Sequence, residues 1–229
     1  MTTTPRLTLS RRQFGLGIAA SAGLVLGGVT PAAAAAVPFD GSWEHLTFRR
    51  LSPNVFETGQ STLKVIADGS SSIFYRMLEP ALHGARRATW TWQVDQSVPP
   101  SDLSKIGADD RNLGMFFVSL DAAGAKRVRP GTSIRSLMTN RSARILMYTW
   151  GGNTALGTVV PSPHAPERLR NLITREAMTG RFTENVDLSA DFLKVFGQQL
   201  DQLVAVAVSS NSENTPARVE ASVSDLMVV

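Results

Sequence analysis

Short segments of strand length recur along this chain from residue 43 onward, separated by clusters of Gly, Pro, Asn and Asp. In one of them Trp90, Trp92 and Val94 alternate with Thr91 and Gln93, which is the two-residue period of a half-buried strand. The predicted strands are Trp43–Phe48, Thr62–Ala67, Ser72–Met77, Ala88–Val94, Leu113–Leu120, Ala143–Trp150, Leu169–Thr174, Phe182–Val186, Leu203–Ser209 and Val219–Val228. So many short strands limit the fold to packed antiparallel sheets.

One segment predicts a helix, Ser189–Gly197. It begins with a capping serine, keeps its apolar residues at helical spacing and ends on a glycine suited to a left-handed stop. The predicted fold is therefore all-β: a two-sheet antiparallel β-sandwich, jelly-roll or galactose-binding-like, with one short helix. The Asp68-Gly69 pair predicts a hairpin between the strands that flank it. No repeat or change in composition marks a second domain, so residues 37–229 are expected to form one.

Residues 1–36 have the organisation of a secretion signal. Arg11 and Arg12 precede an apolar run that glycines dilute, and small residues follow Pro31. The run is too short and too rich in glycine to predict a membrane-spanning helix. The arginine pair is typical of the twin-arginine route, with a general secretory leader as the alternative. We expect cleavage near Ala36, a periplasmic or secreted product, and no transmembrane segment in the mature chain.

The leader also explains much of the chain's positive charge. The whole chain has 23 Lys and Arg against 19 Asp and Glu, a net charge of +4. Three of these basic residues and none of the acidic ones lie in the leader, which leaves +1 for residues 37–229. That balance argues against a nucleic-acid partner. The absence of cysteine excludes a thiol nucleophile and disulfides, so the core must stabilise the fold unaided.

Basic residues concentrate in one segment, Lys126 to Arg144. No acidic residue occurs between Ala122 and Pro166. Residues 122–142 lack strand periodicity and are predicted to form a long loop between strands. Such a loop is either an ordinary solvated segment or a contact surface for an anionic glycan, lipid headgroup or other anionic envelope component.

Several segments along the chain form a recognisable set: Trp90–Val94, Gly107–Arg111, Met115–Val118, Leu146–Trp150, Asp191-Phe192 with Phe196-Gly197, Val206–Val208, Asn211–Thr215 and Asp225-Leu226. Together they resemble an uncharacterised bacterial family, domain of unknown function 3047. The family commonly carries Asp-x-Asp-Asn-Thr near its end, and here Asn211 and Glu213 stand where the two aspartates would be. The resemblance implies an exported β-sandwich protein and implies no activity.

Acidic residues provide the first candidate site. Asp109, Asp110 and Arg111 follow a glycine and precede an apolar strand, so they are expected in a loop at a sheet end, where they could bind a ligand. The candidate metal ligands are Asp109, Glu213, Asn214 and Asp225, because calcium takes carboxylate and amide oxygens. The alternative is that these residues only form turns. Two acids flanking a scissile bond would instead make a glycosidase.

Aromatic residues provide the second candidate site. Trp90 and Trp92 are expected in the core, because they share one face of a strand. Trp150 precedes Gly151-Gly152 at a strand end and is the candidate for an exposed sugar-stacking residue. His45, His83 and His164 show no metal or catalytic spacing, and His164 lies in a proline-rich turn. No nucleophile elbow, phosphate loop or dinucleotide fingerprint occurs.

These observations favour an exported, non-catalytic β-sandwich that binds a ligand, with a glycan as the leading class. The alternatives are a glycan hydrolase or lyase that uses acidic residues near Asp109 and Asp110, and a non-catalytic interaction module. No cofactor is evident, and calcium is the one metal that the oxygen-rich candidates would suit.

Overall fold

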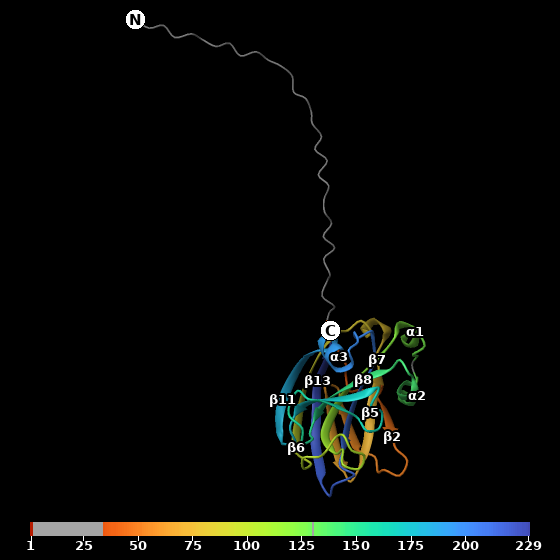
Figure 1. Ribbon diagram of the computed structural model, residues 1–229, viewed down its shortest axis with the longest axis vertical. Helices are drawn as coiled ribbons and strands as arrows, with labels where there is room; N and C mark the ends of the chain where they lie inside the picture. The colour runs from red at the N-terminus through yellow and green to blue at the C-terminus, as the bar shows by residue number, and fades with distance from the viewer. Residues whose placement is uncertain (2–33, 130) are drawn as a thin grey trace. The chain divides into compact units, whose positions relative to one another are not determined.

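The computed structural model describes Met1 and residues 34–129 and 131–229. In this part of the chain two β-sheets pack face to face (Figure 1). Most of the predicted leader, including Arg11 and Arg12, lies outside the described residues. Within residues 34–129 and 131–229, no helix is long and apolar enough to cross a membrane.

The first sheet has six strands in the order β11-β6-β13-β4-β3, and β1 also pairs with β13. Its strands are β1 (Ala35–Ala36), β3 (Val55–Gly59), β4 (Thr62–Asp68), β6 (Arg87–Gln96), β11 (Gly180–Asp187) and β13 (Arg218–Val228). All of its pairs are antiparallel. The residues of β6 alternate between buried and exposed, as a sheet with one solvated face requires.

The second sheet has seven strands in the order β2-β5-β12-β7-β8-β10-β9. These are β2 (Glu44–Thr47), β5 (Ser71–Met77), β7 (Arg111–Leu120), β8 (Arg144–Trp150), β9 (Val159–Pro161), β10 (Leu169–Arg175) and β12 (Gln202–Asn211). Every residue of β7 is buried, because neighbouring side chains cover both faces of the sheet along this strand. One face packs on the first sheet, and residues 121–129 and 131–143 cover one end of the other, which we call the outer face.

The predicted β-sandwich is confirmed, with corrections in detail. β8 and β10 are parallel, so the second sheet is not purely antiparallel. The Asp68-Gly69 turn is not a hairpin, because β4 and β5 belong to different sheets. β1, β3 and β9 were not predicted: β1 has two residues and lies at the end of the predicted leader, β3 is almost wholly exposed and shows no alternation, and β9 has three residues.

The segment predicted as a loop contains two short helices, α1 (Ala122–Ala125) and α2 (Ile134–Thr139). Asp121 and Ser133 cap them, and each is too short to give a periodic pattern. The predicted helix is α3 (Leu188–Phe196), which ends at Gly197 with a φ of 67°. A 3-10 turn at Pro80–Leu82 is the remaining helical element of the described residues.

The main core lies between the two sheets. Trp90 and Trp92 lie in it, as the alternation predicted, and each is 1% exposed. A second apolar cluster lies on the outer face, where Ile134 and Leu137 of α2 pack against strand residues such as Phe116 and Met147. α2 therefore covers part of the outer face (Figure 1), and the uncovered remainder is where the candidate site lies.

Candidate functional site

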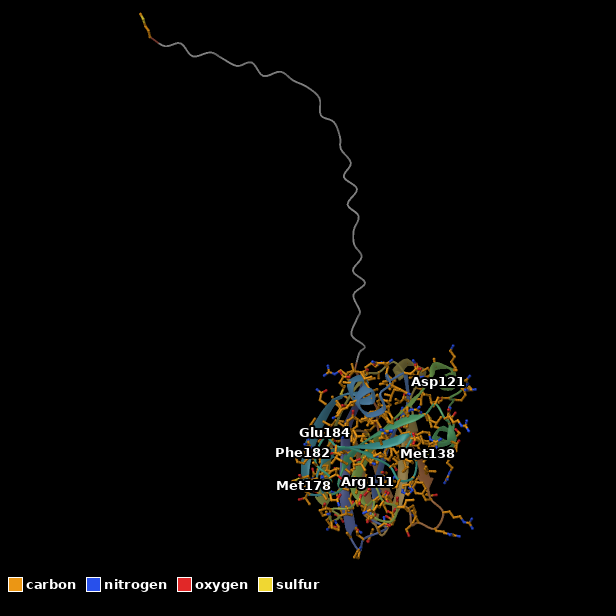
Figure 2. All side chains as sticks on the ribbon, in the orientation of Figure 1. Arg111, Asp121, Met138, Met178, Phe182 and Glu184 are labelled. Atoms are coloured by element: carbon orange, nitrogen blue, oxygen red, sulfur yellow. The ribbon has the colours of Figure 1, made fainter. Side chains whose placement is uncertain are left out.

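A cavity of 310 Å³ opens on the outer face of the seven-stranded sheet, beside α2. Most of its wall is apolar: Phe48, Leu51, Ile73, Leu103, Phe116, Met138, Met147, Pro163 and Leu169. Its polar side chains are Ser71, Asp109, Arg111, Ser162, His164, Asn171, Asn211 and Glu213. Figure 2 labels Arg111, the first residue of β7, and Met138, a residue of α2. The cavity therefore combines an apolar body with a charged region, as small-molecule sites commonly do.

The pairing of β12 with β7 and β5 brings the charged residues of the cavity together. β12 ends where β7 begins, and Asn211 pairs with Arg111 after an irregularity in the ladder. Asn211 also pairs with Ser71 at the start of β5, whose hydroxyl donates to its side-chain oxygen at 2.8 Å. The residues that precede β7 and follow β12 therefore meet at one edge of the sheet, and they bring Asp109 and Glu213 to the same cavity.

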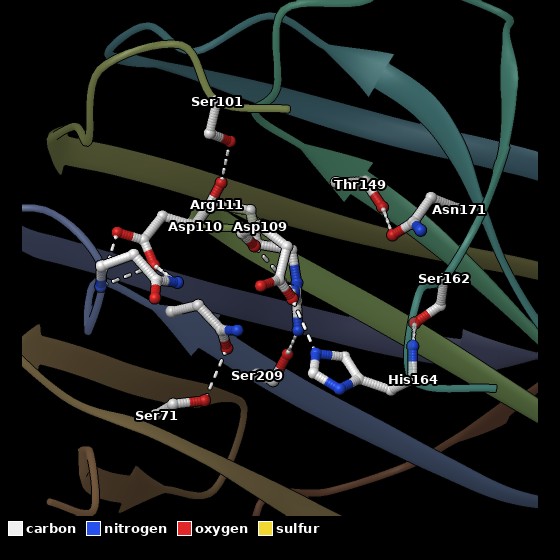
Figure 3. A network of polar contacts seen from close by, with 12 residues as sticks. Ser71, Ser101, Asp109, Asp110, Arg111, Thr149, Ser162, His164, Asn171 and Ser209 are labelled. Carbon is white, nitrogen blue, oxygen red and sulfur yellow. Dashed lines mark hydrogen bonds and ion pairs between the residues drawn. The ribbon is translucent and has the colours of Figure 1, made fainter. Parts of the chain in front are cut away.

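Arg111 is the centre of this region and is 8% exposed. Its Nη2 donates to Ser209 Oγ at 3.0 Å and its Nη1 to the backbone oxygen of Asp109 at 3.3 Å. The carboxylate of Asp109 lies 4.0 Å from Nη1, and its Oδ2 lies 3.1 Å from Nε2 of His164 (Figure 3). Burial lowers the pKa of Arg111, and the carboxylates of Asp109, Glu213 and Asp110 oppose that shift.

Glu213 provides the second carboxyl group of the cavity. Its Oε1 accepts from Asn211 Nδ2 at 3.5 Å, and its Oε2 is buried with no hydrogen-bond partner. Burial raises the pKa of Glu213, and the nearby negative charge of Asp110 raises it further. Nε of Arg111 is likewise buried without a partner. An unpaired donor and an unpaired acceptor thus belong to two residues that line one cavity.

Asp110 has a structural role instead of the predicted ligand-binding one. It is 0% exposed, and its carboxylate accepts from the backbone and side-chain nitrogens of Asn214 and from Thr215 Oγ1, at 2.8 to 3.2 Å. Asp110 therefore fixes the turn after β12 to the start of β7. That turn carries Glu213, so the Asn-Thr pair of the family pattern holds the cavity's second acid in place.

The expectation that Trp150 is exposed is wrong. Trp150 is 0% exposed, and its ring lies 5.2 Å from that of Phe182 and 5.4 Å from that of Trp92. Its Nε1 donates to the backbone oxygen of Met178 at 2.9 Å. The strand end that seemed open in the sequence is closed by the segment that leads into β11. No tryptophan of the described residues presents its ring to a ligand, since Trp43 is also buried.

The structure does not assemble the four predicted metal ligands. Asp225 is exposed and lies within β13, next to Ser224, which pairs with Thr62. Its backbone N–H donates to Ser61. Asp109 and Glu213 line the cavity, and Asn214 binds Asp110 in the turn before Arg218, at the other end of β13 and roughly 20 Å away at the rise of a strand. In the described part of the chain, no three His, Asp or Glu side chains form a metal-binding group. Calcium binding by Asp109, Glu213 and Asn214 stays a prediction, and Asp225 lies too far away to join them.

His164 is the functional candidate that sequence reasoning missed. It lies in the turn between β9 and β10, and 55 residues separate it from Asp109. Its side chain is 55% exposed and stands over the buried carboxylate, at the entrance of the cavity. No spacing could have revealed this pair. The proline-rich turn was the available signal, because it predicts a rigid loop that holds His164 in one place.

A family model described as "Protein of unknown function (DUF3047)" matches residues 41–227. The chain belongs to this family. The comparison with curated proteins found no match.

Solved structures resemble this DUF3047 protein at low identity. A family 11 carbohydrate-binding module of a Clostridium thermocellum cellulase is 7% identical, with a TM-score of 0.44, and the alignment covers 87% of this chain and 96% of that one. The xyloglucanase domain of NopAA from Sinorhizobium fredii is 10% identical, with a TM-score of 0.44 and coverage of 87% and 99%. A family 29 carbohydrate-binding module from Piromyces equi is 7% identical, with a TM-score of 0.35 and coverage of 87% and 91%. Likeness at this level leaves function to be argued from this chain's own residues.

Proposed function

We propose that this protein binds a small ligand that has an apolar body and a hydroxyl-bearing end. One observation carries the proposal: the 310 Å³ cavity is apolar over most of its wall, yet it is lined by Arg111 and Glu213, whose Nε and Oε2 are buried and unpaired. A buried polar group without a partner costs about 1–3 kcal/mol. A ligand that satisfies both atoms recovers that cost on binding.

A hydroxyl group meets this requirement with one oxygen. It accepts from Nε–H of Arg111 and donates to Oε2 of Glu213. An ammonium group cannot accept from Nε–H of Arg111, and a carboxylate has no hydrogen to donate to Oε2 of Glu213. Sugars carry such hydroxyls, so we keep a glycan as the proposed ligand class and narrow it to one that also has an apolar part. With no exposed tryptophan among the described residues, a sugar would enter the cavity by one end and would not lie along an aromatic platform.

Octyl β-D-glucoside, used below its micellar concentration, tests the proposal, because it joins an apolar tail to a hydroxylated ring. We expect saturable heat in calorimetry and a raised melting temperature, with weaker effects from octanoate and none from glucose alone. The variant Ile73→Trp fills the cavity and should abolish binding. Ile66→Trp is the matched control, because Ile66 is a half-buried isoleucine of the other sheet. Equal binding by both variants would refute the proposal.

A glycan hydrolase or lyase is the second candidate function, and a specific observation favours it. Two carboxyl groups line the cavity in different surroundings: Asp109 faces His164 and Arg111, whereas burial raises the pKa of Glu213. Two acids in unlike environments can divide the roles of base and acid. Turnover of a panel of p-nitrophenyl glycosides, lost in both Asp109→Asn and Glu213→Gln, would support it. Binding of octyl glucoside without turnover of any glycoside would support the binding function and contradict the hydrolase or lyase function.

We also propose that Arg11 and Arg12 direct export and that the product is periplasmic or secreted. The order of arginine pair, diluted apolar run and small residues supports this. Replacing both arginines by lysine should retain the protein in the cytoplasm at full length. Unchanged export of that variant would favour the general secretory route.

A further inference from the structure

Beside the cavity entrance, the turn between β2 and β3 exposes two arginines and a leucine. Arg49 and Arg50 are both exposed, and Leu51 after them is 36% exposed. Leu51 N–H donates to the backbone oxygen of Phe48 at 3.3 Å, which closes the turn. Phe48 and Leu51 line the cavity, so the tip of this turn forms part of its entrance.

α2 adds a third arginine at the same place. The guanidinium of Arg135 donates to the backbone oxygen of Thr47, where β2 ends. Met138 of the same helix lines the cavity opposite the turn. We call Arg49, Arg50, Leu51 and Arg135 the basic rim. In residues 34–129 and 131–229, no carboxylate lies within 4.0 Å of a rim arginine, although six other Lys or Arg side chains have such a partner.

We propose that the basic rim docks this protein on a lipid bilayer that carries anionic headgroups. Charge complementarity is the first argument, since three arginines without acidic partners face solvent around one opening. Leu51 is the second argument. An apolar side chain at the tip of a basic turn can enter the headgroup region of a bilayer, whereas a purely anionic polysaccharide would leave it in water. Docking in this orientation would also turn the apolar cavity toward the bilayer, a source of amphipathic ligands.

Arg50 has a φ of 74°, a conformation that favours glycine. Arg50→Gly therefore removes the charge while relieving the backbone, and Arg49→Ser completes a rim variant that should fold at least as well as the parent. The matched control is Arg87→Ser with Arg181→Ser. Both residues are exposed on the six-stranded sheet, so the control loses the same charge from another surface.

The test is flotation of the full chain with vesicles of phosphatidylcholine alone or with 30% phosphatidylglycerol. All variants share the same N-terminal segment, so any binding by that segment cancels in the comparison. An arginine near an anionic surface contributes about fivefold in partitioning, so the rim variant should bind the anionic vesicles roughly 25-fold less than the parent. The control should stay within about twofold, and high salt should abolish the difference.

Equal losses in the rim variant and the control would overturn the proposal, because only net charge would then matter. Equal binding of the parent to both kinds of vesicle would overturn it as well. Rim-dependent capture by immobilised anionic polysaccharide, with no vesicle binding, would assign the rim to a glycan instead.

Discussion

Oδ2 of Asp109 lies 3.1 Å from Nε2 of His164, and this contact joins the start of β7 to the turn between β9 and β10 across the cavity entrance. The two partners differ in burial, because the side chain of Asp109 is 6% exposed and that of His164 is 55% exposed. Their contributions to stability should differ accordingly.

Asp109→Asn should destabilise the protein by about 3 kcal/mol, because it removes a carboxylate beside the buried guanidinium of Arg111. His164→Gln should cost less than about 1 kcal/mol, since an exposed partner is screened by solvent. Urea unfolding of both variants gives the comparison. Asp225→Asn is the control for Asp109→Asn: Asp225 is exposed, and asparagine tolerates its φ of 56°. A His164 variant as unstable as the Asp109 variant would contradict this assignment.

Glu213 should make stability fall as pH rises. Burial raises its pKa in the folded state above the ordinary value of 4.5, so the folded protein binds the proton more tightly than the unfolded chain. Where the folded state holds more protons, the free energy of unfolding decreases with increasing pH. This loss begins near pH 4.5 and is complete above the folded-state pKa.

Glu213→Gln should remove that component of the pH dependence and leave the variant at least as stable as the parent at pH 7. Melting temperatures of parent and variant, measured from pH 4 to pH 8, test this. Parallel curves for the two proteins would show that Glu213 does not titrate in the way its burial implies.

Gly114 should be required beside Met147 and Arg111, two residues that line the cavity. A Cβ there would lie 2.4 Å from Met147 Sδ and 3.2 Å from Arg111 Nε. Gly114→Ala should therefore cost about 1–3 kcal/mol through overpacking and displace both side chains. The control Gly84→Ala has nothing within 4 Å of its Cβ and should be neutral or slightly stabilising. Recovery in Gly114→Ala with Met147→Val would identify Met147 as the main clash, and a neutral Gly114→Ala would contradict the close packing.

Asp110→Ala should destabilise the protein by about 3 kcal/mol, because it removes a fully buried carboxylate that accepts from the backbone and side-chain nitrogens of Asn214 and from Thr215 Oγ1. Thr215→Val, which removes one donor, should cost about 1 kcal/mol. Hydrogen exchange of the turn after β12 should quicken far more in the first variant. An Asp110→Ala protein with unchanged exchange there would show that the turn holds without this anchor.

The sequence predicts much of the sandwich because alternation survives in strands with one solvated face, such as β6 and β13. Prediction from the sequence fails where residues distant in the chain decide whether a strand is buried and what it pairs with. β3 is an exposed edge strand whose residues show no alternation. Asp68-Gly69 suits a hairpin, but in the structure it connects a strand of one sheet to a strand of the other. Trp150 stands at a strand end, but the segment that leads into β11 covers it.

The candidate site was only partly predictable for a similar reason. Asp109 and Arg111 could be named because charged residues beside an apolar strand are conspicuous in sequence. Glu213 could be grouped with Asp109 as an oxygen ligand, but its place beside Arg111 depends on the long-range pairing of β12 with β7. His164 could not be named, because it reaches the cavity through the pairing of β10 with β8. Asp110 illustrates the opposite error, since its hydrogen bonds to the turn after β12 are invisible in sequence.

Methyl NMR of the methionines during titration with octyl glucoside tests the central claim, binding in the cavity, most directly. Met138 and Met147 line the cavity. Met115 lies in the core between the sheets, and Met227 lines a separate depression beside β1, so both are internal controls. We expect the signals of Met138 and Met147 to shift saturably while those of Met115 and Met227 stay unchanged. Saturable shifts at Met227, or no shift at Met138 and Met147, would contradict the account.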